Sequence, residues 1–237
     1  MIDNINTEHI LFLDIETVPM YPDYSYLPDR WKKLWERKAE QKRKDQTPAE
    51  FYTSAGIFAE FGKIVCICVG YFQVADGKRR FRIKSFAGDL EKELLTNFAE
   101  LLNKHFSQRE HSLCAHNGKE FDFPFIARRM LVNGVKLPSL LDIAGKKPWE
   151  VQLLDTMELW RFGDYKSYTS VELLAALFGI PTPKDDIDGS RIYSVYWEEK
   201  NLERIVKYCR KDVLTIAQIY LRMKGEPTVP DADVVML

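Results

Sequence analysis

Apolar residues recur along this chain with two different periods, which separate strands from helices. Residues 10–13 form an unbroken apolar run that is typical of a strand covered on both faces, and we expect this strand to end at the acidic residues that follow. Residues 64–71 and 80–86 predict two more strands. Asp76-Gly77 between them is a hairpin signal, so these two strands are expected to pair.

Helical spacing dominates the rest of the chain. Residues 90–106 predict a helix, and residues 112–115 predict a short strand after it. Residues 169–172 have the form of a capping box, and Gly179 stands where the helix that follows would stop. A last long helix is expected over residues 201–223. This order of elements predicts an α/β sheet with helices packed on it.

The length favours one domain, residues 1–237, with an insertion at about residues 19–60. The chain can form one sizeable core, and no stretch rich in Pro, Gly and Ser divides it. Within the insertion, the basic stretch 30–44 carries Trp31 and Trp35 at i, i+4 spacing. Two hypotheses fit this stretch: a flap that guides a nucleic-acid strand, or a solvated helical hairpin whose tryptophans pack on the domain.

Composition and charge exclude few functions. A net charge of −1 argues against a globally basic nucleic-acid binder, but metals and local basic patches would still let a nuclease hold phosphates. No apolar run approaches the roughly 18 residues that span a membrane. The first residues also lack the pattern of a secretory signal. We therefore expect a cytoplasmic protein without membrane contact.

Four cysteines, Cys66, Cys68, Cys114 and Cys209, contain no C-x-x-C pair. The first two alternate on an expected strand and so point to one face. We favour buried free thiols over a zinc site for these residues.

Two acids follow the first apolar run. Asp14 and Glu16 are two apart on a strand, so their side chains leave the same face. They also lie at the carboxyl end of the strand, where open α/β sheets bind their ligands. The pair can share a metal ion, and ordinary surface acids are the alternative.

A third acid, Asp122, stands just before Pro124 at the start of an expected helix. It could simply cap that helix. However, it precedes Phe125 and Ile126 on the stripe that should face the sheet, where an ionised acid needs a compensating charge. Nearby, we interpret His116 as structural rather than as a ligand.

The fourth acid, Asp212, falls within the apolar stripe of the last helix, which Cys209 and Ile216 help to mark. A carboxylate there needs a partner. Tyr208 precedes it by one helical turn and projects from the same side. The alternative is a Tyr-Asp pair bonded to the backbone of the sheet.

The three motifs D-I-E, H-N-G-K-E-F-D and Y-C-R-K-D together resemble the DEDDy group of 3′ to 5′ exonucleases, which have an RNase H-like fold. Two longer segments, L-C-A-H-N-G-K-E-F-D-F-P-F-I-A-R-R and G-I-P-T-P-K-D-D-I-D-G-S, look like the predicted exonucleases related to the proofreading domain of family-B DNA polymerases. The resemblance implies an α/β, RNase H-like mixed β-sheet flanked by helices.

The resemblance also implies the roles of individual residues. Two divalent cations, Mg²⁺ or Mn²⁺, would be held by four acids, and Tyr208 would orient the attacking water. Thr17 and Val18 resemble positions that meet the terminal nucleotide, and Asn117 and Phe121 could bind or stack on the strand. The acids implied as metal ligands are Asp14, Glu16, Asp122 and Asp212.

The resulting hypothesis is a metal-dependent exonuclease that hydrolyses phosphodiester bonds at the 3′ end of single-stranded nucleic acid, with DNA favoured over RNA. Because few residues follow Asp212, we expect a free-standing enzyme without a polymerase. The alternatives are an RNA 3′-end trimming enzyme and a non-catalytic nucleic-acid-binding module on the same fold. The segment 184–189 looks like a family signature, but its role is open.

Overall fold

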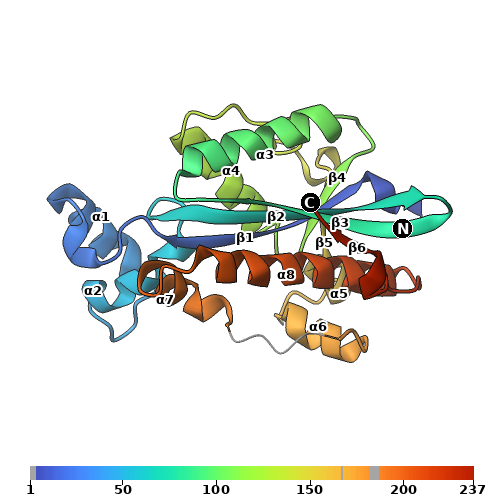
Figure 1. Ribbon diagram of the computed structural model, residues 1–237. Coiled ribbons are helices and arrows are strands. Elements are labelled where there is room, and N and C mark those ends of the chain that lie inside the picture. Colours follow the sequence, from blue (N-terminus) through green and yellow to red (C-terminus); the bar gives the residue numbers. More distant parts are fainter. Residues whose placement is uncertain (1–3, 167, 182–186) are drawn as a thin grey trace.

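The computed structural model describes residues 4–166, 168–181 and 187–237. Its centre is a six-stranded sheet with the order β5-β4-β1-β2-β3-β6 (Figure 1). The pairs β1/β2 and β2/β3 are antiparallel, whereas β4 is parallel to β1, β5 to β4, and β6 to β3. The predicted mixed sheet is therefore confirmed. The strands are β1 Ile10–Pro19, β2 Gly62–Ala75, β3 Lys78–Ala87, β4 Ser112–Ala115, β5 Leu153–Asp155 and β6 Val234–Met236.

Helices cover both faces of the sheet (Figure 1). On one face lie α3, Glu91–His105, and α4, Asp122–Val132. The other face carries the long helix α8, Leu202–Met223, with three short helices beside it. These are α5 Thr156–Arg161, α6 Val171–Leu177 and α7 Ile192–Trp197.

Strand β1 contributes to a separate core on each face, which explains its unbroken apolar run. Ile10 and Phe12 belong to the core under α8, whereas Leu11 and Leu13 belong to the core under α3 and α4. Successive side chains of a strand point to opposite faces. Asp14 continues the even-numbered series and therefore lies on the α8 face.

The insertion packs around its own aromatic centre at one end of the sheet. It contains α1, Asp29–Ala39, and α2, Pro48–Phe51. Trp35 is fully buried there, and its indole Nε1 donates to the Pro48 carbonyl over 2.7 Å. Trp31 contacts Phe61 edge to face and stays 37% exposed. Trp35 therefore packs mainly within the insertion rather than on the rest of the domain, and the strand-guiding role stays a prediction.

Two details of the expected elements are wrong. Strand β1 does not end at its acids, because β2 pairs with it as far as Pro19, with a shift in register between Glu16 and Thr17. The capping box at residues 169–172 is also absent, since Ser170 is the N-cap and its side chain accepts from the Leu173 N–H. The predicted stop is confirmed, because Gly179 follows the helix with a φ of 63°.

Other expected elements are confirmed with shifted ends. Strands β2 and β3 form the hairpin, and Asp76 and Gly77 both have positive φ, as a tight hairpin turn requires. Helix α8 begins after Asn201, whose side chain caps it, and ends at Met223 as expected. Residues 184–186 of the open signature lie outside the described residues. In the described ranges, no helix combines the length and apolar character that crossing a bilayer needs.

Candidate active site

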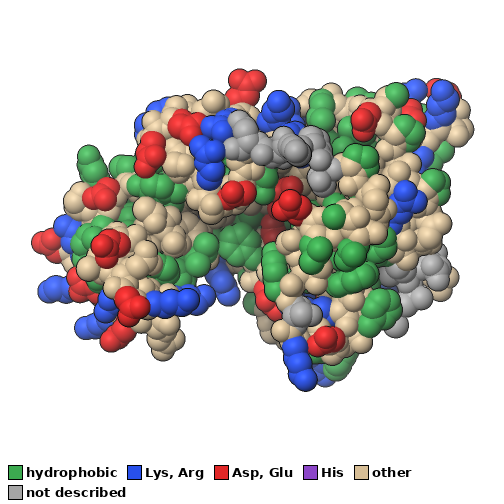
Figure 2. Space-filling view, turned by 90° about the horizontal axis from the view of Figure 1, so that it is seen from below, with side chains coloured by type: hydrophobic (Ala, Val, Ile, Leu, Met, Phe, Trp, Pro, Cys, Tyr) green, Lys and Arg blue, Asp and Glu red, His purple; other side chains and the backbone are tan. Residues whose placement is uncertain are grey.

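A cleft of about 930 Å³ opens on the α8 side of the molecule, with acidic side chains inside it (Figure 2). Four acids from three separate segments of the chain line it together with Tyr208. The structure thus brings together all five residues that the sequence predicts for metal binding and catalysis. The acids are Asp14, Glu16, Asp122 and Asp212.

The first two acids enter the cleft from β1. In the β1/β2 ladder, Asp14 lies opposite Cys68 and Glu16 opposite Cys66. Glu16 is only 7% exposed. A surface location is therefore wrong for Glu16, and its carboxylate lies where an ionised group requires compensation.

Asp122 reaches the same place from the start of α4. Its Oδ1 accepts a hydrogen bond from the Ile15 N–H, at 3.2 Å. Strand β4 pairs with β1 only up to Phe12, so the Asp122 carboxylate occupies the side of β1 that β4 has left. Phe121, not Asp122, is the N-cap of α4 and makes no side-chain cap bond. The capping interpretation is therefore wrong.

Helix α8 supplies Tyr208 and Asp212, one turn apart on the side that faces the cleft. A hydrogen bond joins the tyrosine hydroxyl to the Asp212 carboxylate. The pairing half of the alternative hypothesis is thus correct. Because both side chains also line the cleft, the pair is open to a ligand rather than buried against the sheet.

The electrostatics of the cluster oppose four ionised acids. Burial, followed by repulsion from neighbouring acids, raises the pKa values of Asp14 and Glu16 well above their usual range. Burial likewise raises the pKa of Asp122 to about 7 and that of Asp212 to about 6. These shifts are those of a site that lacks compensating positive charge.

The donor set of the cleft fits divalent cations. Asp14 Oδ2 is buried and, among the described residues, has no hydrogen-bond partner. Carboxylate oxygens are the ligands that Mg²⁺ and Mn²⁺ prefer. Cations would relieve the repulsion between the acids and occupy the free oxygen.

Burial also keeps Tyr208 protonated. Desolvation, and then the charge of Asp212, raises the pKa of its hydroxyl far above the usual value near 10. In the metal-free site this phenol is therefore a hydrogen-bond donor at neutral pH.

The four residues predicted to meet substrate divide into two pairs. Asn117 and Phe121 line the cleft, and Asn117 Oδ1 is buried without a hydrogen-bond partner among the described residues. Thr17 instead donates its hydroxyl to the Gly56 carbonyl over 2.8 Å. Val18 is fully buried in the core, so a side-chain contact from Val18 to a nucleotide is not available in this structure.

Sequence reasoning missed Asp155, the residue that fixes the Asn117 loop. Its carboxylate accepts from the backbone N–H groups of Asn117, Lys119 and Met157, at 2.9, 3.0 and 2.9 Å. It is also the N-cap of α5. An Asp followed three residues later by Glu158 is the signal that could have found it.

His116, which precedes Asn117, also helps to hold this loop in place. One ring nitrogen lies 2.9 Å from Thr156 Oγ1 and the other 2.7 Å from the Thr169 carbonyl oxygen. Both nitrogens thus have protein partners. The structural interpretation of His116 is the correct one.

Two neighbouring positions in this loop restrict which residues can occupy them. Asn117 has a φ of 59°, a left-handed conformation that Asn tolerates better than most residues. At Gly118, a Cβ atom would lie 2.4 Å from the Cβ of Ala115. The N-G pair thus lets the chain turn sharply from β4 toward Asp122.

Residues 57–227 match the family described as a predicted 3′-5′ exonuclease related to the exonuclease domain of PolB. The matched stretch contains Asp122, Tyr208 and Asp212. Asp14 and Glu16 precede it, and the fold joins them to the matched residues in one cleft.

Two solved structures are similar in outline. A family B DNA polymerase from the hyperthermophilic archaeon Pyrobaculum calidifontis is 15% identical over 94% of this chain, with a TM-score of 0.49. The RNase domain of the yeast Pop2 protein is 10% identical over 92% of this chain, with a TM-score of 0.46. This chain covers 27% of the polymerase chain and 78% of the Pop2 chain.

Proposed function

Since the chain belongs to the family of predicted 3′-5′ exonucleases related to the exonuclease domain of PolB, we propose that it removes nucleotides one at a time from the 3′ end of single-stranded nucleic acid. Two divalent cations, Mg²⁺ or Mn²⁺, would be held by Asp14, Glu16, Asp122 and Asp212. The observation that supports this proposal most is the convergence of four acids in one cleft, of which Glu16 and Asp122 are buried.

Bound cations of this kind supply a nucleophilic water at neutral pH and stabilise the charge of the leaving oxygen. The protein holds the acids at fixed positions for them. Asp14 and Glu16 are fixed by the β1/β2 ladder, and Asp122 by its bond to the Ile15 N–H. Little reorganisation is then required when substrate arrives.

Tyr208 positions the attacking water in this proposal. Its hydroxyl remains protonated and is bonded to Asp212, so it presents its oxygen beside the acids. A water that accepts a hydrogen bond from this group would be aligned with the scissile phosphate. Because the phenol holds its proton, the proton of the water must leave by another route, such as bulk solvent.

Asn117 and Phe121 lie on the cleft wall where the terminal nucleotide would enter. The unpaired Asn117 Oδ1 can accept a hydrogen bond from the hydroxyl of a free 3′ end. Phe121 is partly exposed and contacts Phe125 through its ring. Its free face suits stacking on a base of any identity.

The experiment is a digestion of 5′-labelled single-stranded DNA and RNA of the same sequence, with Mg²⁺, Mn²⁺ or EDTA. We expect a ladder of products shortened from the 3′ end with either metal, and none with EDTA. A blocked 3′ terminus should stop the reaction. Faster digestion of RNA than of DNA would favour the alternative of an RNA 3′-end trimming enzyme. Binding without cleavage under all conditions would favour the non-catalytic module.

A further inference from the structure

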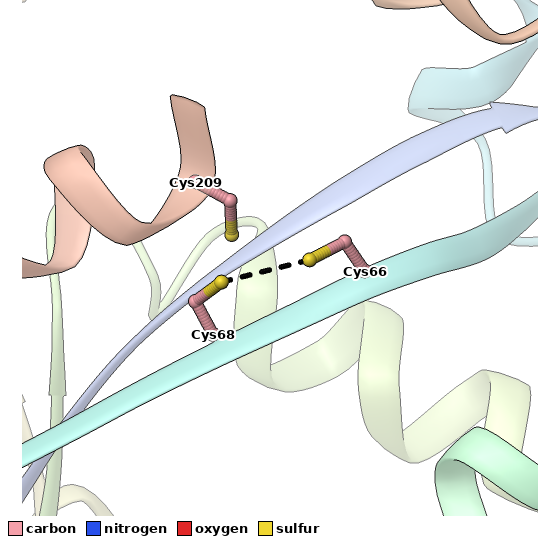
Figure 3. A group of neighbouring side chains, drawn as sticks. All are labelled: Cys66, Cys68 and Cys209. Carbon is pink, nitrogen blue, oxygen red and sulfur yellow. Dashed lines mark hydrogen bonds between the residues drawn. The ribbon is translucent and has the colours of Figure 1, made fainter. Parts of the chain in front are cut away.

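Three cysteine side chains meet beside the acids (Figure 3). Cys66 and Cys68 come from β2 and Cys209 from α8, and all three are free and fully buried. Their sulfur atoms lie within 4.8 Å of one another, and the Cys66 and Cys68 sulfurs are 3.6 Å apart. In Figure 3 the Cys209 sulfur points toward the space between the other two.

This spacing is close to that of thiolates around one metal ion. With a Zn–S distance of about 2.3 Å, ligand sulfurs lie roughly 3.8 to 4.0 Å apart. The separations here fit that range, because one pair of sulfurs is 3.6 Å apart and the other pairs are no more than 4.8 Å apart. Side-chain shifts of about 1 Å or less would therefore complete a three-sulfur site.

One positively charged side chain lies near the cluster, on the Cys68 side. Ser85 Oγ lies 3.2 Å from Cys68 Sγ, and Arg210 Nε donates to the same Ser85 oxygen over 2.7 Å. Ser85 thus connects the Arg210 guanidinium to the Cys68 sulfur. A buried charge without such a neighbour would be costly.

Cys209 also links the sulfur cluster to the acids. Its sulfur and the carboxylate oxygens of Asp14 and Glu16 lie within 4.8 Å of one another. An oxygen of either acid is therefore within reach as a fourth ligand. Hard cations prefer oxygen and soft cations prefer sulfur, so the two neighbouring sites would select different metals.

We propose that Cys66, Cys68 and Cys209 form a site for one thiophilic divalent cation of the Zn²⁺ class, next to the oxygen-lined site of the exonuclease. The sequence favours buried thiols because it lacks a C-x-x-C pair. The spacing of the cysteines in the sequence does not show the cluster. The fold forms it, because α8 places the Cys209 sulfur beside two cysteines of β2 that are more than a hundred residues away. A bound ion would join α8 to β2 beside the acids.

The test is a titration of the reduced, metal-free protein with Cd²⁺ in the presence of excess Mg²⁺, which keeps the acids loaded. Cadmium bound to thiolates has a sulfur-to-metal charge-transfer absorption, whereas cadmium bound to carboxylates has none. We expect the band to saturate at one Cd²⁺ per chain. Zn²⁺ should then displace the Cd²⁺ and remove the band.

Cys66→Ala and Cys209→Ala should each weaken Cd²⁺ binding by about 100-fold or more, because even residues behind a ligand change metal affinity 10 to 100-fold. Cys114→Ala is the matched control, since Cys114 is equally buried but lies on β4 outside the cluster. It should bind as the wild type does. Thermal unfolding without metal checks each fold, and Cys209→Ser replaces Cys209→Ala if the alanine variant does not fold.

Absence of the band in the wild type would overturn the proposal and leave a packed group of neutral thiols. An equal loss in Cys114→Ala, or a band that persists in the cluster variants, would overturn it as well. None of these readouts depends on nuclease activity. Failure of the metal site is therefore distinguishable from failure of the proposed exonuclease function.

Discussion

At the scale of single residues, acids of two different kinds lie in and beside the cleft. Asp155 accepts several backbone N–H groups, so its charge is compensated by the fold. Asp14 has an oxygen without a partner among the described residues, and its pKa is raised by burial and by neighbouring acids. The first kind stabilises the loop, and the second is suited to a ligand.

This difference predicts opposite effects of the same substitution. Asp14→Ala should abolish turnover while leaving the metal-free protein as stable as the wild type or slightly more stable, because it relieves repulsion. Asp155→Ala, the matched control, should lower the free energy of unfolding by roughly 2 to 4 kcal/mol, since it leaves buried N–H groups unpaired. Denaturant unfolding in EDTA measures both. Equal destabilisation would mean that Asp14 is a structural partner.

Tyr208→Phe keeps the ring and removes the oxygen. Metal affinity and substrate binding should persist, and single-turnover rates at saturating Mg²⁺ should fall about 10² to 10⁴-fold, the usual size of an orienting or proton-transfer group. Tyr220→Phe, a substitution on the same helix in the core away from the cleft, is the control. A wild-type rate in the Tyr208→Phe variant would leave Tyr208 as a packing residue.

The raised pKa values also predict how stability depends on pH. The folded-state pKa values of Asp122, about 7, and Asp212, about 6, lie above the unfolded value of about 3.9. Their contribution to stability is therefore complete below pH of about 4 and is lost as pH rises toward 7. Thermal melts in EDTA should show this loss, and saturating Mg²⁺ should remove it. A metal-free protein with no such loss would contradict the shifts.

At the scale of elements, the sequence predicted those with a clear apolar run, period or turn signal, the four-residue β4 included, and missed the two strands of three residues. The hairpin and α8 have clear periodicity and turn or cap residues, and both were predicted. Strands β5 and β6 have three residues each, too few for any period, and they form only because a parallel neighbour is already in place. The extension of β1 past its acids depends likewise on pairing with β2.

The insertion is the element whose role the structure leaves as a hypothesis. If α1 guides the strand, replacing Lys32, Lys33 and Arg37 by Gln should weaken binding of single-stranded DNA and reduce its log-log salt slope by up to about 2. The chemical step should be unaffected. Neutralising Lys78, Arg80 and Lys104, which lie on β3 and α3, is the matched control. Identical salt slopes in both triple variants would favour the solvated hairpin.

At the scale of the whole molecule, the site depends on contacts between distant segments. Sequence motifs predicted the four acids and Tyr208, because each motif has a distinctive local form. They did not indicate that Asp155 holds the Asn117 loop or that three cysteines lie beside the acids, since only the sheet order and α8 bring these residues together. The burial of the Val18 side chain was not predicted either, because it follows from the extension of β1.

The central claim is that these acids make the chain a 3′-end exonuclease, and one comparison tests it most directly. Wild type and Asp212→Asn are given 5′-labelled linear DNA and a closed circular single strand of equal length, with Mg²⁺. We predict that the wild type shortens the linear strand one nucleotide at a time from the 3′ end and leaves the circle intact. The variant should degrade neither substrate. Cleavage of the circle at a comparable rate, or full activity of the variant, would contradict the account.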